Sequence, residues 1–170
     1  VDSINLKLTK KLPFMVTTAL PEGWNTKNPM LLLGEWCKFH PKISKIRNKF
    51  SVVKKHHCSN EFNIYQNYKY TSKLYERLLS ALTKTLNEHH GEKYSDRYWR
   101  VLLGPWLGYF LTIVYDRWLI LKSIKYKGRI SGTYILKMSD ESLLPLDIEE
   151  FDTFCNNDLW NHFIFSKVLE

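Results

Sequence analysis

The stretch from Tyr98 to Trp118 constrains the fold of this chain more than any other. It is the most apolar part of the sequence, and residues 101–115 carry no charge. This uncharged run is shorter than the about 20 residues that a membrane-spanning helix needs. We therefore expect a long buried helix, which bends or restarts at Gly104-Pro105 because proline lacks the amide donor and clashes with the preceding turn.

The helices around this stretch are also predicted from periodicity and capping residues. Leucines recur every four residues from Leu74 to Leu86, which predicts an amphipathic helix with one apolar stripe. Thr71 or Ser72 is expected to begin it, and Gly91 to end it. Two shorter helices are expected near the C-terminus, over residues 147–154 and 158–169, with Asn157 or Asp158 as the cap of the second.

Four short apolar runs, rich in leucine and β-branched residues, are candidates for strands. Strands that alternate with helices predict an α/β fold. We expect a Rossmann-like, three-layer domain with a small, mostly parallel sheet and several long helices. The 170 residues have the size of one domain, and few Gly and Pro are available for a flexible linker, so 1–170 is expected to be a single domain. The candidate strands are residues 12–20, 30–34, 50–53 and 133–136.

The charge of the chain is unevenly distributed. The net charge is +8, yet residues 138–170 hold eight of the 17 acids and only Lys167 among the bases. The segment Lys38–Lys55 holds seven Lys/Arg and no acid, so we expect it to contact phosphate-bearing partners, such as the anionic inner face of the cytoplasmic membrane, or to form a solvated basic face. Three widely spaced cysteines suggest a reducing compartment, and hence the cytoplasm.

Ligands of open α/β sheets bind beyond the carboxyl ends of the strands. Thr17 and Thr18 lie at the end of the first expected strand, and Glu35 and Trp36 follow the second. We expect these residues to contact substrate. A carboxylate at position 35 is suited to act as a base or to accept a hydrogen bond from a sugar hydroxyl, although a salt bridge to a nearby Lys is the alternative.

Two further groups of candidates lie near the ends of the apolar stretch. Asp116 and Arg117 are charges in an apolar helix; as neighbours they point about 100° apart, so each is expected to need an outside partner, in a ligand or another side chain. At the other end, Arg97 and Trp99 stand where a helix N-terminus favours anions, and we expect them to bind substrate phosphate or sugar. The alternative is that the aromatic residues there belong to the core and the arginines to the surface. His90 is an alternative catalytic base, or a histidine that interacts with the helix dipole.

The sequence contains none of the common nucleotide-binding or hydrolase motifs, and its Cys and His spacings match no zinc pattern. We therefore expect no metal site. No nucleic-acid-binding module is present either, so no specific nucleic-acid partner is expected.

Six sequence blocks occur in order along the chain: Thr17-Thr-Ala-Leu20, Leu33-Gly-Glu-Trp-Cys37, Leu86-Asn-Glu-His89, Tyr98-Trp-Arg-Val-Leu-Leu-Gly-Pro-Trp-Leu107, Tyr115-Asp-Arg117 and Asn157-Asp-Leu-Trp-Asn-His162. The Gly-Glu-Trp-Cys and Gly-Pro-Trp-Leu blocks are specific in combination. In this order the blocks resemble a family of transferases associated with bacterial O-antigen and other surface-polysaccharide biosynthesis. The resemblance runs from about Phe14 to Leu169.

This resemblance implies a glycosyltransferase-like enzyme with two Rossmann domains, related to glycerophosphate transferases. The nucleotide-activated donor would bind the C-terminal domain, and this chain would be the acceptor-side N-terminal half, with a carbohydrate or lipid-linked acceptor as its partner and no cofactor of its own. The chain begins with Val and ends inside an expected helix, which fits a portion of a longer protein. Alone it is expected to be inactive. The alternative is a non-catalytic basic module that binds nucleic acid or a protein.

Overall fold

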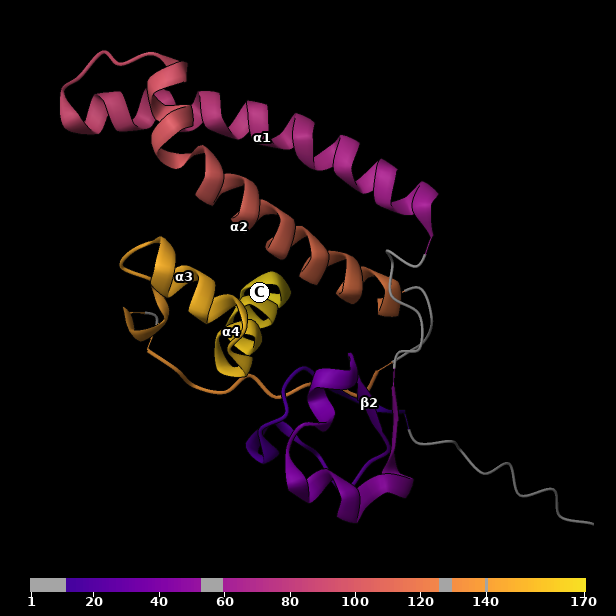
Figure 1. Ribbon diagram of the computed structural model, residues 1–170. Helices are drawn as coiled ribbons and strands as arrows, with labels where there is room; N and C mark the ends of the chain where they lie inside the picture. The colour runs from indigo at the N-terminus through magenta and orange to yellow at the C-terminus, as the bar shows by residue number, and fades with distance from the viewer. Residues whose placement is uncertain (1–11, 53–59, 126–129, 140) are drawn as a thin grey trace, which may run out of the picture.

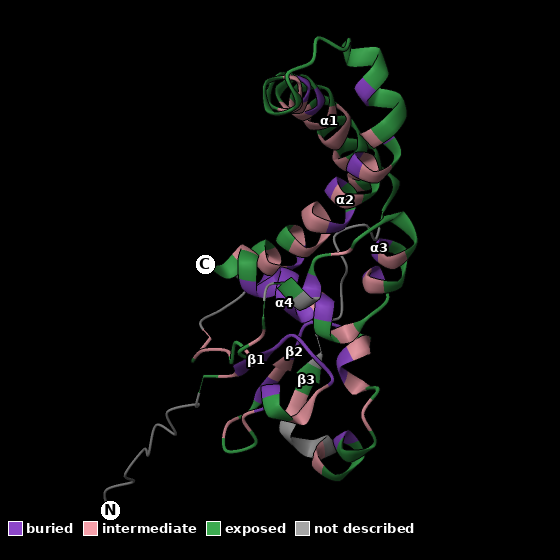
Figure 2. Ribbon diagram, turned by 90° about the vertical axis from the view of Figure 1, so that its left-hand side faces the viewer, coloured by how far each residue is buried: buried purple, intermediate pink, exposed green. Residues whose placement is uncertain are grey.

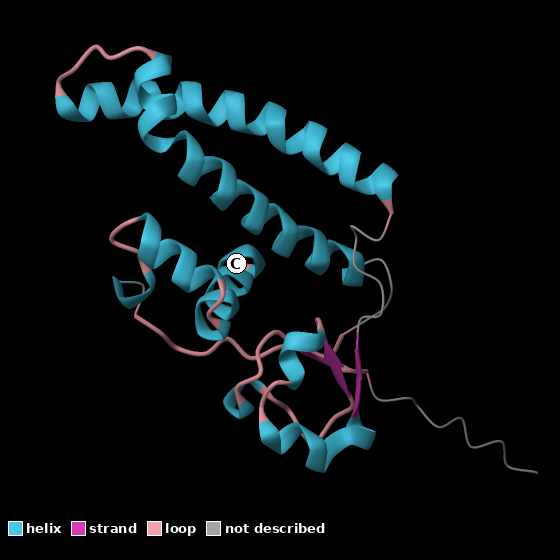
Figure 3. Cartoon of the chain, viewed as in Figure 1, coloured by secondary structure: helices cyan, strands magenta, loops and turns pink. Residues whose placement is uncertain are grey.

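The computed structural model describes residues 12–52, 60–125, 130–139 and 141–170 (Figure 1). Three parallel strands form a sheet in the order β1-β2-β3. The expected α/β fold with a small parallel sheet and long helices is confirmed (Figure 3). The strands are β1 (Phe14–Val16), β2 (Met30–Leu32) and β3 (Phe50–Val52).

The side chains of β1 alternate between the two faces of the sheet, as in any strand. Phe14 and Val16 pack with Trp24 and Cys37 on one face, which the short 3-10 helices η2 (Glu35–Lys38) and η3 (Pro41–Lys49) help to cover. Met15 faces the other way and packs against residues of the two helices α2 and α4. The sheet is therefore the middle of three layers.

The prediction of a fourth strand over residues 133–136 is wrong. Backbone pairing with β1 occurs earlier, at an isolated parallel bridge between Phe14 and Gly132, where the Met15 N–H donates to the Gly132 carbonyl at 2.9 Å. The N–H of Leu136 donates instead to the side chain of His162 at 3.0 Å. A backbone group that is bonded to a side chain cannot extend the ladder, so no strand forms here.

Helix α1 (Glu61–His90) is longer than its leucine repeat predicts. It begins ten residues before Thr71, and the Asn60 side chain caps it by accepting from the Asn63 N–H at 2.8 Å. The prediction that Thr71 or Ser72 begins the helix was wrong, because residues 60–70 contain no Gly or Pro to stop a helix from extending to the first good cap. Gly91 ends the helix in the left-handed conformation, as expected (φ 69°).

Helix α2 (Asp96–Lys125) runs antiparallel to α1 as a long hairpin. It is one helix with Pro105 inside it, and the ribbon changes direction in its first third (Figures 1 and 2), so of the two expected alternatives the helix bends and does not restart. Gly104 allows the two helices to approach, because a Cβ there would lie 2.5 Å from the Tyr75 hydroxyl. The hairpin has its own small core, which includes Leu79, Trp99, Leu107 and Leu111.

Two helices follow at the C-terminus, both close to the predicted bounds: α3 (Ile148–Cys155) and α4 (Asp158–Leu169). Asn157 caps α4, as expected, by accepting from two backbone N–H groups. Short 3-10 turns occur at η1 (Pro21–Gly23) and η4 (Glu141–Leu143). Within the described residues, no helix has both the length and the hydropathy required to cross a bilayer.

Candidate functional site

The N-terminus of α4 lies at the carboxyl end of β1, where a ligand of an open α/β sheet is expected. The Thr18 hydroxyl donates to Asp158 Oδ2 at 2.5 Å, and the Ala19 N–H donates to the same oxygen at 3.0 Å. Thr18 is fully buried. The other oxygen, Asp158 Oδ1, is buried and has no hydrogen-bond partner among the described residues. Buried polar atoms are nearly always paired, and the exceptions often mark functional positions.

His162, one turn further along α4, joins Thr17 to the segment after Gly132. Its Nδ1 lies 2.6 Å from the Thr17 hydroxyl oxygen, and its Nε2 accepts from the Leu136 N–H. Because Nε2 is an acceptor, the neutral ring carries its proton on Nδ1 and donates it to Thr17. Burial lowers the pKa of His162 below its ordinary value, against the nearby Asp158 carboxylate, which acts to raise it. His162 is thus a neutral structural link rather than a free base.

Trp36 completes this polar cluster from the end of β2. Its indole N–H donates to the Thr17 carbonyl at 3.1 Å, and its ring stacks on Phe165 of α4, with 6.2 Å between the centroids. The ring folds back over Gly34, where a Cβ would lie only 1.8 Å from a ring carbon. Glycine is therefore required at position 34 because there is no space for a side chain. Its backbone conformation is not the reason, because it is extended and available to any residue.

We predict that Gly34→Ala displaces the Trp36 ring and lowers the free energy of unfolding by about 1–3 kcal/mol, the usual cost of overpacking. Chemical denaturation would measure the loss. In a double-mutant cycle, Trp36→Leu should absorb most of the effect of Gly34→Ala, because the smaller side chain leaves room for the methyl group. Equal losses with Trp36 and with Leu at position 36 would contradict this account.

Arg117 reaches the same helix from α2, and Asp116 joins the cluster through Arg117. Arg117 donates through Nε and Nη2 to Asn161 Oδ1 of α4, at 3.0 and 2.7 Å, so the expected outside partner is a side chain. Arg117 Nη1 also pairs with Asp116 directly. The expectation that the two neighbours do not meet is wrong, because the long guanidinium side chain can fold back across the helix surface. The guanidinium also lies 5.9 Å from the centroid of the Phe165 ring.

Glu35 stands beside this cluster but its carboxylate is in solvent. Its side chain is 73% exposed and pairs with Lys38 at 2.6 Å, which is the salt bridge that we gave as the alternative. An exposed carboxylate next to Trp36 remains accessible to a substrate. Its catalytic role therefore stays a prediction.

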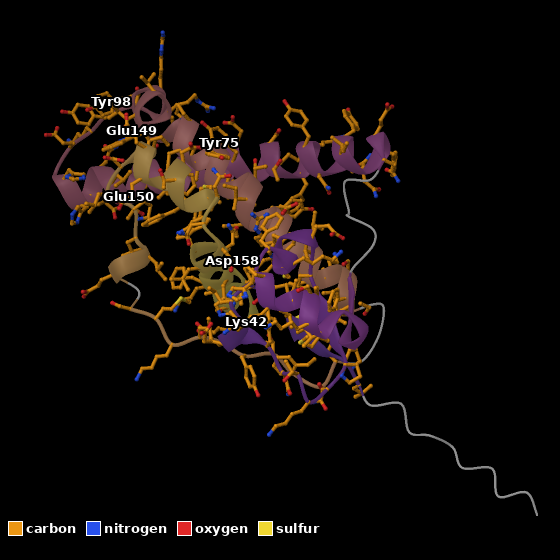
Figure 4. All side chains as sticks on the ribbon, turned by 60° about the horizontal axis from the view of Figure 1, so that its bottom comes forward. Lys42, Tyr75, Tyr98, Glu149, Glu150 and Asp158 are labelled. Carbon is orange, nitrogen blue, oxygen red and sulfur yellow. The ribbon has the colours of Figure 1, made fainter. Side chains whose placement is uncertain are left out.

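His90, Arg97 and Trp99 lie elsewhere, at the far end of the α1–α2 hairpin. Twenty residues of α2 separate Arg97 from Arg117, which is about 30 Å of helix. Figure 4 labels the neighbouring Tyr98 at this far end and Asp158 at the base of α4. Trp99 is buried and donates to Asn87 Oδ1 at 2.9 Å, and the His90 ring stacks on it. One small ligand cannot reach both groups of residues.

The structure thus brings Thr17, Thr18, Trp36, Asp116 and Arg117 together around α4. Sequence reasoning missed the three residues of α4 that connect them, Asp158, Asn161 and His162. All three belong to the block Asn157-Asp-Leu-Trp-Asn-His162, but we interpreted its first residues only as a helix cap. A run of Asp, Asn and His on one short helix that is otherwise apolar was the signal that could have revealed them.

The described residues offer few candidates for a nucleophile or a metal ligand. Cys37 is fully buried beneath β1, and burial raises the pKa of its thiol to about 12, so it is not a reactive thiolate at neutral pH. Within the described residues, no three His, Cys, Asp or Glu side chains gather as a metal site would require. His56, His57 and Cys58 lie outside those residues.

Comparisons with known proteins bear on the chemistry of this cluster. The model of one protein family, described as LIC12162 family transferase, matches residues 13–170. No curated protein and no solved structure gave a significant match. The matched range contains the whole sheet, all four α-helices and every residue of the cluster around α4. On this evidence the chain belongs to the LIC12162 family of transferases.

Proposed function

We propose that this chain is the acceptor-side N-terminal portion of a glycosyl- or polyol-phosphate transferase that acts in surface-polysaccharide biosynthesis, such as that of O-antigen. Membership of a transferase family supports transfer chemistry. The order of sequence blocks supports the finer assignment. The nucleotide-activated donor would bind a further C-terminal domain, so this portion alone would not complete the reaction.

The observation that carries the proposal is Asp158. Its carboxylate stands at the carboxyl end of β1, tied through Oδ2 to Thr18 and Ala19, with a second oxygen that has no partner among the described residues. A fixed carboxylate of this kind suits hydroxyl groups, which need an acceptor and which a carbohydrate or polyol offers in number. Trp36, half-buried and bonded to the carbonyl of Thr17, the residue before Thr18, offers an aromatic ring.

The remaining predicted residues receive roles within the same proposal. Glu35 would act as the base that takes the proton of the attacking hydroxyl, because it is exposed and adjacent to Trp36. Arg117 would hold α4 in place through Asn161, and would meet phosphate only by exchanging that partner. Lys38, Lys42 and Lys45 lie at the surface, where they could contact an anionic membrane that holds a lipid-linked acceptor.

The test is an assay of the complete enzyme with a panel of nucleotide-activated sugars and polyols, in which acceptor-dependent release of nucleotide is measured. We expect Asp158→Asn and Glu35→Gln each to lower kcat/KM by about 100-fold or more, the scale of one lost catalytic or positioning interaction. Asp96→Asn, at the exposed start of α2, is the matched control and should leave the rate unchanged.

The cellular role has its own test. Deletion of the gene should alter the composition of the surface polysaccharide, and wild-type coding sequence should restore it while the Asp158→Asn sequence should not. An unchanged polysaccharide after deletion would contradict the proposal. Salt-dependent binding of DNA or RNA, with no turnover of any donor, would favour a basic binding module instead.

A further inference from the structure

The first turns of α1 have their apolar and polar faces reversed. Large apolar side chains are exposed there: Phe62 by 70%, Tyr65 by 60% and Tyr68 by 68%, and Ile64 by 50%. The residues that are partly covered are instead polar and recur every four positions, Asn63, Asn67 and Thr71. A helix at the surface of a globular protein normally places its polar side toward water.

The four exposed residues form one continuous surface, which we call the aromatic face (Phe62, Ile64, Tyr65 and Tyr68). At about 100° per residue they fall within about 160° of the helix circumference, so they share one side of α1. In Figure 4 side chains at this end of α1 project into open space, while Tyr68 also lines a pocket with Gly108 and Leu111 of α2. Exposed apolar patches of this kind mark interaction surfaces.

The second half of the same helix follows the ordinary pattern. From Leu74 onward the leucines pack against α2, and Leu79 is fully buried between the two helices. The reversal is therefore confined to the first turns, and it is not a property of the whole hairpin. A local reversal is expected where a helix meets an apolar environment that the other described residues do not provide.

The charges on this side are mixed, with a basic excess. Lys69 and Lys73 follow the aromatic face on the same side of the helix wheel, and both are exposed. Glu61 falls within the same arc, while Glu76 is neutralised by a bidentate pair with Arg100, at 2.8 and 2.6 Å, so a net positive charge remains. Lysine side chains next to apolar groups can extend toward anionic headgroups while their stems remain on apolar surface.

We propose that the aromatic face docks onto the interfacial zone of an anionic lipid bilayer. Tyrosine suits this zone because its ring is apolar while its hydroxyl stays in water. A fluid surface can also accommodate side chains that fan over 160° of a helix, which a flat protein surface cannot. A second copy of the chain is the other occupant that this face could take, and its test is the oligomeric state in the absence of lipid.

Sedimentation of the full 170-residue chain with vesicles tests this proposal. With equal amounts of phosphatidylglycerol and phosphatidylcholine at low salt, the wild-type chain should pellet with the lipid. Phe62→Ser combined with Tyr65→Ser should weaken the partition coefficient at least tenfold. Lys69→Gln combined with Lys73→Gln should weaken it on these vesicles and remove most of its salt dependence, because each lysine near the surface attracts anionic lipid.

Leu146→Ser is the matched control, because Leu146 is 92% exposed but lies far from α1 in the loop before α3. It should bind vesicles like the wild-type chain. All exchanged residues are exposed, so circular dichroism should show unchanged folding in every variant. As a second readout, amide hydrogen exchange should slow in residues 61–70 when vesicles are added.

Three outcomes would overturn the proposal: no binding of the wild-type chain, equal binding by the Phe62/Tyr65 variant, or exchange protection confined to residues 38–45. Light scattering without lipid gives a fourth outcome. If the wild-type chain forms an oligomer and the Phe62/Tyr65 variant does not, the aromatic face belongs to a contact with a second copy. The proposal is independent of the proposed function, because vesicle binding is measured without donor or acceptor.

Discussion

Replacement of Phe165 by alanine is expected to lower the free energy of unfolding by about 3–5 kcal/mol, the range for a large aromatic side chain removed from a core. Phe165 is fully buried in α4. Its ring lies between the Trp36 indole, stacked at 6.2 Å, and the Arg117 guanidinium, at 5.9 Å. It therefore connects the end of β2 to α2, and its loss leaves a cavity in the middle of the cluster.

Urea denaturation would measure this loss, with the midpoint and slope compared between variant and wild type. Leu169→Ala is the matched control on the same helix, because Leu169 is 41% exposed and its truncation should cost about 0.5 kcal/mol or less. If the two variants were equally stable, Phe165 would not be the centre of this contact.

Replacement of His162 by leucine is the second large effect that we expect, a loss of about 2–4 kcal/mol. Leucine is similar in size, so the loss comes from hydrogen bonds rather than from a cavity. The buried Thr17 hydroxyl and the Leu136 N–H each lose a partner, and an unsatisfied buried polar group costs about 1–3 kcal/mol. His89→Leu, at the exposed end of α1, is the control and should be close to neutral.

The same residue predicts a pH dependence. Burial lowers the pKa of His162 in the folded chain, so the unfolded chain binds the proton more tightly. This contribution to stability is fully present above the ordinary pKa of about 6.5, and it is lost as the pH falls from there toward the folded value. The slope in this window should be at most about 1.4 kcal/mol per pH unit.

Denaturation of the wild-type chain and of His162→Leu between about pH 8 and about pH 5 would test this dependence. The variant should lack the His162 contribution, so the difference between the two stabilities should shrink as the pH falls. A constant difference across the range would show that His162 does not bind a proton on unfolding.

Local sequence patterns predicted much of the fold because they depend on neighbours in the chain. The apolar runs that begin near Phe14 and Met30 became β1 and β2, and Asn157 capped α4 as expected. The same patterns were wrong where a distant partner decided the outcome. Residues 133–136 form no strand, because the Leu136 N–H bonds to His162, 26 residues further along.

The sequence also placed part of the candidate site. Thr17, Thr18 and Trp36 were chosen because strands of an open sheet present ligands at their carboxyl ends, and all three lie in the cluster around α4. Arg97 and Trp99 were chosen because they stand at the start of the apolar helix, where a helix N-terminus favours anions. They lie at the opposite end of a long helix from the sheet, because a predicted N-terminus does not say which end of the helix meets the sheet.

By itself, the sequence determined the elements of this protein: which residues are apolar, where helices can begin, and that short strands alternate with long helices. Only the tertiary structure decided that Asp158 and His162 bond to Thr18 and Thr17, residues 140 and 145 positions away. Such contacts have no local signature, because they depend on how the chain between them packs. The tertiary structure likewise decided that the aromatic face of α1 is exposed to solvent, because α2 does not cover this side of the helix.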